Sequence, residues 1–144
     1  MVKTVRSIAA ALLTILLTLT VSARGQGKTA ETTVWDKVFT DEQAARGKLS
    51  YQSACSDCHM EHLRGDGQAP PLKGEDFAPQ WKTVGAFMAA MGSQMPPDKP
   101  GGLPFATYCD ITAFILQANN YPAGNKELAG SLEELDKILL TPKP

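Results

Sequence analysis

Two cysteines and a histidine in one short run carry the clearest chemistry of this 144-residue chain. Cys55 and Cys58 stand three positions apart, and His59 follows directly. At this spacing two thiols can add to the vinyl groups of a porphyrin while the adjacent imidazole binds its iron as an axial ligand. The run therefore predicts one covalently attached haem c per chain, with His59 as the first iron ligand.

Other sites also use a cysteine pair at this spacing. A structural zinc site takes four ligands, commonly as two separated pairs, and Cys109 with His62 makes a poor second pair. A thioredoxin-like dithiol belongs to a fold with strands and helices in alternation, and no run in the sequence reads as a strand. Haem attachment is therefore the preferred interpretation. Cys109 itself lies in an apolar stretch and is expected to be a buried small side chain, with an intermolecular disulfide as the less favoured role.

A second axial ligand would come from one of five side chains: His62, Met60, Met88, Met91 and Met95. The first two follow His59 too closely to reach the opposite face of the ring. Met88 and Met91 fall on an apolar helical face, where methionine usually serves packing. Met95 lies in an irregular segment and precedes two prolines, which would hold a loop stiffly against the ring. Met95 is therefore the predicted sixth ligand, ahead of Met91.

The N-terminus has the pattern of an export signal. Lys3 and Arg6 give it positive charge, residues 8–21 form an apolar run, and small residues end at Ala23. Residues 1–23 are therefore predicted to be a signal peptide of a periplasmic or secreted protein. The run is short against the about 20 apolar residues of a membrane span. An uncleaved anchor stays open as an alternative and would be the one expected contact with a membrane.

The rest of the chain is about 121 residues long, the size of one domain, and it carries twelve basic against fifteen acidic side chains. It has no basic stripe, so nucleic-acid binding is not expected. Hydrophobic periodicity and capping residues predict an all-α fold with helices over 41–53, 76–81, 83–92, 105–118 and 131–140. The predicted organisation is a signal peptide (1–23), a flexible leader (24–38), a haem domain (39–128), and a C-terminal helix and tail (129–144).

Residues 40–127 resemble the mono-haem class I c-type cytochromes. Gly47 and Tyr51 ahead of the haem motif resemble that family's first helix, whose glycine permits a close crossing with the last core helix, here 108–116. The resemblance implies a small cytochrome c fold, with three to five helices around one covalently attached haem.

The same resemblance implies roles for residues outside the motif. Residues 71–74 resemble the family's P-x-L-x-G turn, which makes the carbonyl of Pro71 the expected hydrogen-bond acceptor of His59. Met95 with the proline after it resembles the loop that carries the distal methionine. Trp81 resembles a tryptophan that packs near the haem edge.

Residues 94–97, 101–103 and 119–128, with the extra helix from Ser131, resemble cytochromes found with periplasmic quinoprotein dehydrogenases. This resemblance implies redox partner proteins: a periplasmic dehydrogenase as donor, and an oxidase or another cytochrome as acceptor. The expected function is single-electron transfer rather than catalysis, because imidazole and thioether together fill both axial positions. Two alternatives stay open. One is a peroxidase-like or gas-binding haem enzyme, for which His62 is the sole candidate acid or base. The other is a fixed haem subunit of a dehydrogenase complex.

Overall fold

Two long helices that cross at a glycine organise the fold. The structure is a computed structural model and describes residues 31–142. Helix α2 (Asp41–Ala54) begins where the hydroxyl of Thr40 accepts a hydrogen bond from the Gln43 amide at 3.1 Å. It crosses α5 (Phe105–Ala118). A Cβ on Gly47 would overlap the backbone carbonyl of Asp110, which confirms the close crossing implied by the resemblance.

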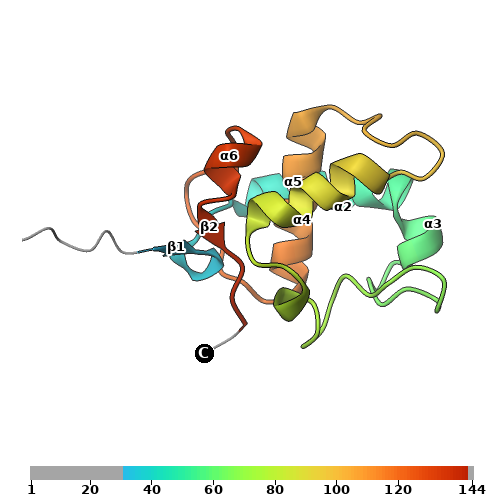
Figure 1. The fold of residues 1–144 in the computed structure, drawn as a ribbon, viewed down its shortest axis with the longest axis horizontal. Coiled ribbons are helices and arrows are strands. Elements are labelled where there is room, and N and C mark those ends of the chain that lie inside the picture. Colours follow the sequence, from blue (N-terminus) through green and yellow to red (C-terminus); the bar gives the residue numbers. More distant parts are fainter. Residues whose placement is uncertain (1–30, 143–144) are drawn as a thin grey trace, which may run out of the picture.

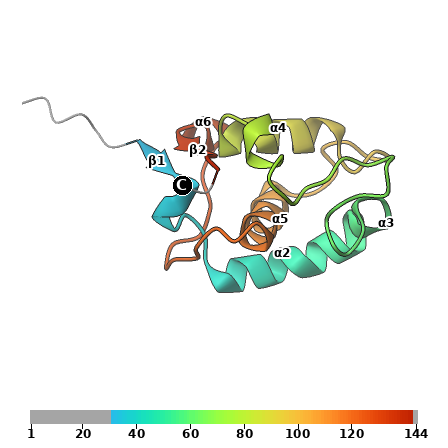
Figure 2. The same ribbon diagram turned by 90° about the horizontal axis from the view of Figure 1, so that it is seen from below.

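The remaining helices surround this pair. Short helix α3 (Ser56–His59) follows α2 almost directly, and α4 (Val84–Gln94) packs on the opposite side of α5, so that α5 lies between α2 and α4 (Figure 2). The 3-10 turns η1 (Val34–Asp36) and η2 (Ala78–Gln80) and helix α6 (Leu132–Leu135) complete the helical set. The prediction of an all-α domain with three to five helices is confirmed in this arrangement (Figure 1).

The C-terminal segment differs from its prediction. A helix over 131–140 was expected, but α6 is a single turn that Ser131 and Glu134 cap reciprocally. The chain then becomes the short strand β2 (Ile138–Leu139), which pairs in parallel with β1 (Thr32–Thr33). The extended form prevails because it buries Leu140, whose amide donates to the Lys82 carbonyl at 3.2 Å. The prediction that the chain has no strand was therefore wrong.

Part of the predicted leader also belongs to the folded unit. Val34 is fully buried, and the ring of Trp35 packs against that of Tyr121 with centroids 4.8 Å apart. The indole N–H of Trp35 donates to the Pro142 carbonyl at 3.1 Å. The predicted boundary between leader and folded domain, at residue 38, therefore lies too far along the chain. Residues 32–38 close the fold together with the C-terminal segment. The predicted signal peptide lies outside the described residues.

Two further helices differ in length from their predictions. The helix expected over 76–81 is only η2, and α4 extends past residue 92 to Gln94. Met95 is therefore the C-cap of α4, with its amide bonded to the Met91 carbonyl at 2.8 Å. Along residues 31–142, no helix is long and apolar enough to cross a membrane.

The crossing gives a first prediction. Gly47→Ala should destabilise the protein by about 3 kcal/mol or more, because a methyl group there meets rigid backbone rather than a side chain that can move. Gly92→Ala is the matched control, since a Cβ at this helical position meets nothing within 4 Å and alanine favours a helix by about 1 kcal/mol. Chemical denaturation of both variants measures the difference. Equal stabilities would contradict the close crossing.

Candidate haem-binding site

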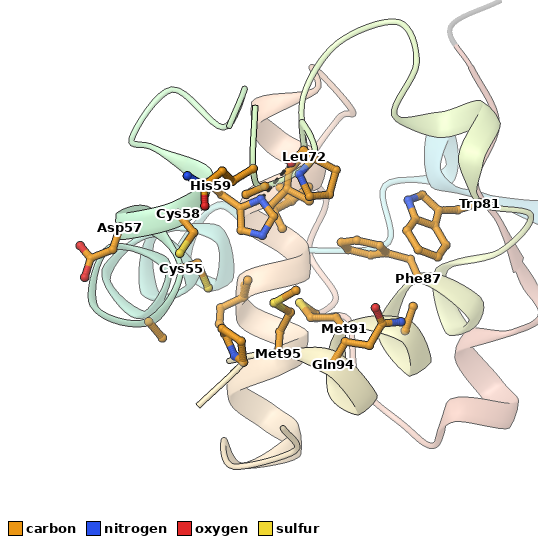
Figure 3. Close-up of a pocket in the computed structure, with 18 residues that line it drawn as sticks. Cys55, Asp57, Cys58, His59, Leu72, Trp81, Phe87, Met91, Gln94 and Met95 are labelled. Atoms are coloured by element: carbon orange, nitrogen blue, oxygen red, sulfur yellow. Dashed lines mark hydrogen bonds between the residues drawn. The ribbon is translucent and has the colours of Figure 1, made fainter. Parts of the chain in front are cut away.

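The haem motif lies at the junction of α2 and α3, which places its three side chains around one short turn. The turn forms because the amides of Cys58 and His59 both bond to the Cys55 carbonyl, at 3.3 and 2.9 Å. His59 is buried, Cys55 is half-buried and Cys58 is exposed. All three line the same cavity, with the cysteines on one side of it (Figure 3).

The cavity has a volume of about 330 Å³, within the range of roughly 300–1,000 Å³ of small-molecule and cofactor sites. Helices α2, α4 and α5 and the loop after α3 all contribute to its walls. Its apolar lining includes Ala54, Leu72, Phe87, Ala90, Ile111 and Ile115. A large, mostly apolar group therefore suits this space better than a hydrated ion.

The hydrogen bond of the His59 ring defines which nitrogen is available to a metal. Nδ1 lies 2.9 Å from the carbonyl oxygen of Pro70. Because a carbonyl can only accept, Nδ1 carries the proton and Nε2 keeps its lone pair. The acceptor expected from the resemblance was the carbonyl of Pro71, so that expectation was wrong by one residue. The next amide along, that of Leu72, bonds to the Leu63 carbonyl at 2.8 Å and fixes the register that presents Pro70.

Two thioethers lie on the other side of the cavity. Figure 3 shows the sulfur atoms of Met91 and Met95 across the space from the ring of His59. The four-residue interval at the end of α4 places both on one face. The hydroxyl of Tyr108 donates to the Met95 carbonyl at 2.7 Å and holds this segment against α5. Met88, by contrast, is buried away from the cavity.

The remaining candidate residues differ in whether they line the cavity. Trp81 lines the cavity and packs on Phe87 with ring centroids 5.3 Å apart. His62 is exposed and lies outside the lining, as does buried Cys109. In the part of the chain that the structure describes, no three histidine, cysteine or acidic side chains group as a metal site. Neither His62 nor Cys109 therefore supports the zinc alternative.

The pKa of the Cys55 thiol disfavours a redox dithiol at this site. Burial raises the pKa of the Cys55 thiol to about 11, so this thiol is protonated at neutral pH. Reactive dithiols instead have thiol pKa values lowered to about 3.5–7.5 by helix N-termini or nearby positive charge. Burial likewise raises the pKa of Cys109 to about 11.

A family model described as cytochrome c oxidase, cbb3-type, subunit III matches residues 42–115, from α2 through most of α5. The chain belongs to this family of cytochrome c domains. No curated protein and no solved structure matches it significantly. As a cytochrome c domain, the chain serves haem-based electron transfer and carries its haem covalently.

The residues that line the cavity fit a covalently attached haem. Two thiols and an imidazole with a free Nε2 line one side of an apolar cavity, and thioethers line the other. Sequence reasoning missed the Pro70 carbonyl that bonds to His59 and the Tyr108 hydroxyl that bonds to Met95. A tyrosine in an apolar helical band is itself a signal, because a buried phenol needs a hydrogen-bond partner.

Tyr108→Phe tests the support of the Met95 segment. The substitution keeps the ring and removes one hydrogen bond, so it should cost about 1 kcal/mol of stability. It should also speed the binding of cyanide to the ferric protein, because the Met95 carbonyl keeps only its longer bond, 3.3 Å from the Gly101 amide, and the segment can move more easily. Tyr121→Phe is the matched control: its hydroxyl bonds the Thr141 carbonyl at 2.8 Å, on a segment outside the cavity. Equal cyanide rates in both variants would show that the Tyr108 bond does not hold the site.

Proposed function

We propose that this cytochrome c domain is an exported single-electron carrier, with haem attached to Cys55 and Cys58 and its iron ligated by His59 and Met95. The observation that carries the proposal is the position of the Met95 thioether across an apolar cavity from the free Nε2 of His59 (Figure 3). Met95 is preferred to Met91 because it ends α4, where Tyr108 fixes its backbone.

The haem, when bound, supplies the one-electron couple of its iron. The chain's own residues set the conditions for that couple. The bond from Nδ1 to Pro70 orients the imidazole and makes it more basic. A thioether favours the ferrous state and raises the potential relative to a second imidazole. His59 and Met95 would hold the iron from fixed elements, so electron transfer would need little rearrangement, and the apolar walls keep water away.

The residues around the cavity favour a carrier over an enzyme. A peroxidase-like site needs an acid or base on the open side of the iron. Within the described chain, Asp57 is the one carboxylate in the lining, and Figure 3 shows it pointing away from the cavity. His62 is on the surface, where its Nδ1 accepts from the Arg64 amide at 3.2 Å. Neither group is placed to act on a molecule at the iron.

The proposed route runs from a periplasmic dehydrogenase to an oxidase or another cytochrome. Its support is the pattern of residues 1–23, which favours export, and the likeness of 119–128 to cytochromes found with quinoprotein dehydrogenases. A fixed haem subunit of a larger complex is the second candidate, supported by the matched family's description as an oxidase subunit. The size of the native haem protein on gel filtration separates the two, since a free carrier elutes near its own mass.

Absorption spectra test the ligand assignment. The mature protein, made in a host that attaches haem, should give a c-type spectrum with the weak far-red band of iron–sulfur ligation. Met95→Ala should abolish that band and lower the potential, because a hard ligand or an open site replaces the thioether. Met91→Ala is the matched control and should retain the band. Loss of the band in the control alone would move the ligand to Met91, and a high-spin wild-type spectrum that shifts with carbon monoxide would favour the enzyme.

The cofactor should also be part of the folded core. Cys55→Ala combined with Cys58→Ala should yield a colourless, poorly folded protein, because a cavity of about 330 Å³ would stay unfilled in a small domain. Cys109→Ala serves as control, since this buried thiol lies outside the cavity, and should retain covalent haem. Circular dichroism and haem staining measure both properties. A compact, fully helical double variant would contradict this dependence.

A further inference from the structure

The residue that ends α5, Asn119, makes more contacts than a helix end requires. Its Nδ2 donates to the Ile115 carbonyl at 2.8 Å, which completes the helix terminus. The same Nδ2 donates to the Leu72 carbonyl at 2.9 Å, and its Oδ1 accepts from the Gly74 amide at 3.0 Å. One amide side chain thus binds the backbone of a loop 45–47 positions away in the sequence.

That loop is the one that supports His59. Leu72 follows the acceptor Pro70 by two residues and itself lines the cavity. Its amide is held by the Leu63 carbonyl at 2.8 Å while its carbonyl is held by Asn119, so its backbone is fixed on both sides. Only one residue separates Leu72 from Pro70 in the chain, so a displacement of the Leu72 backbone would move Pro70 as well.

Asn119 is also the link between this loop and α5. Across residues 31–142, the bonds of Asn119 are the only hydrogen bonds that join loop 60–76 to α5 or its cap. The loop is also attached to α2, where the hydroxyl of Tyr51 donates to the Met60 carbonyl at 2.7 Å, and to α3, where His59 bonds to Gly65 and Pro70. Apart from the bond between His59 and Pro70 itself, residues 66–74 therefore depend on Asn119 for their hydrogen-bonded attachment to the crossed helices α2 and α5.

We propose that Asn119 is a positioning residue for the iron ligand His59: it clamps the loop whose Pro70 carbonyl accepts the Nδ1 proton. The chain Asn119–Leu72–Pro70–His59 links the end of α5 to the orientation and basicity of the imidazole. This role rests on the proposed function, because it presumes that His59 ligates the iron. It goes beyond the helix stop that the sequence predicts at this position.

Hydrogen exchange in the reduced holoprotein, followed by NMR, tests the clamp. In Asn119→Ala, the Nδ1 proton of His59 and the amide proton of Leu72 should exchange about tenfold faster, because two loop bonds are lost. The amides in the middle of α2 and α5 should keep their rates. Asn120→Gly is the matched control: Asn120 is exposed and has φ 66°, a conformation that glycine adopts freely.

The pattern of rates decides between positioning and capping. Unchanged His59 exchange, or an equal rise at every core amide, would overturn the proposal and leave Asn119 as a helix cap only. Asn119→Asp keeps the size and the acceptor for Gly74 but removes the donor to Leu72, so it should release the loop as well.

If neither variant folds, the wild-type protein supplies the test. The Nδ1 proton of His59 and the amides of Leu72 and Gly74 should then share one opening free energy, and unequal values would overturn the clamp. A wild-type protein that lacks a c-type spectrum would instead refute the proposed function, so the two failures are distinguishable.

Discussion

The close crossing of α2 and α5 is the constraint on which the site depends. Gly47 lets the two backbones touch, and both sides of the cavity are supported from these two helices. Helix α2 leads directly into the cysteines and His59, and its Tyr51 holds the start of the following loop. Helix α5 supplies Tyr108 to the methionine segment. A wider crossing would therefore move the imidazole and the thioether relative to each other.

The crossing depends on packing more than on charge. Arg46 forms ion pairs with Asp110 at 3.0 Å and Glu127 at 2.9 Å beside Gly47, and hydrogen bonds to these two carboxylates raise its pKa above the ordinary value. Its side chain is nevertheless 48 % exposed, and exposed ion pairs add little because water screens them. Overlap with rigid backbone costs more, so the glycine decides how closely the helices approach.

What the sequence could predict was local. The bounds of α2 and α5 depend on neighbouring residues, and the predicted ranges 41–53 and 105–118 agree with the structure to within one residue. Two of the errors concern contacts between segments that are separate in the sequence. The pairing of residues 32–33 with 138–139 replaced a predicted helix, and the register of Leu72 on Leu63 moved the acceptor from Pro71 to Pro70. Local patterns could not reveal these contacts, since each depends on two segments meeting in space.

The two proposed iron ligands, His59 and Met95, differ in how the surrounding chain supports them. His59 is part of a helical turn, is bonded to Pro70, and is followed by a loop attached to α2 through Tyr51 and to α5 through Asn119. Met95 is held by the last turn of α4, and its carbonyl accepts from the Tyr108 hydroxyl at 2.7 Å and from the Gly101 amide at 3.3 Å. Outside its own helix and loop it is therefore attached to α5 alone, whereas the loop behind His59 is attached to both α2 and α5. Because an open local state requires all of these bonds to break together, opening of the site should begin on the methionine side.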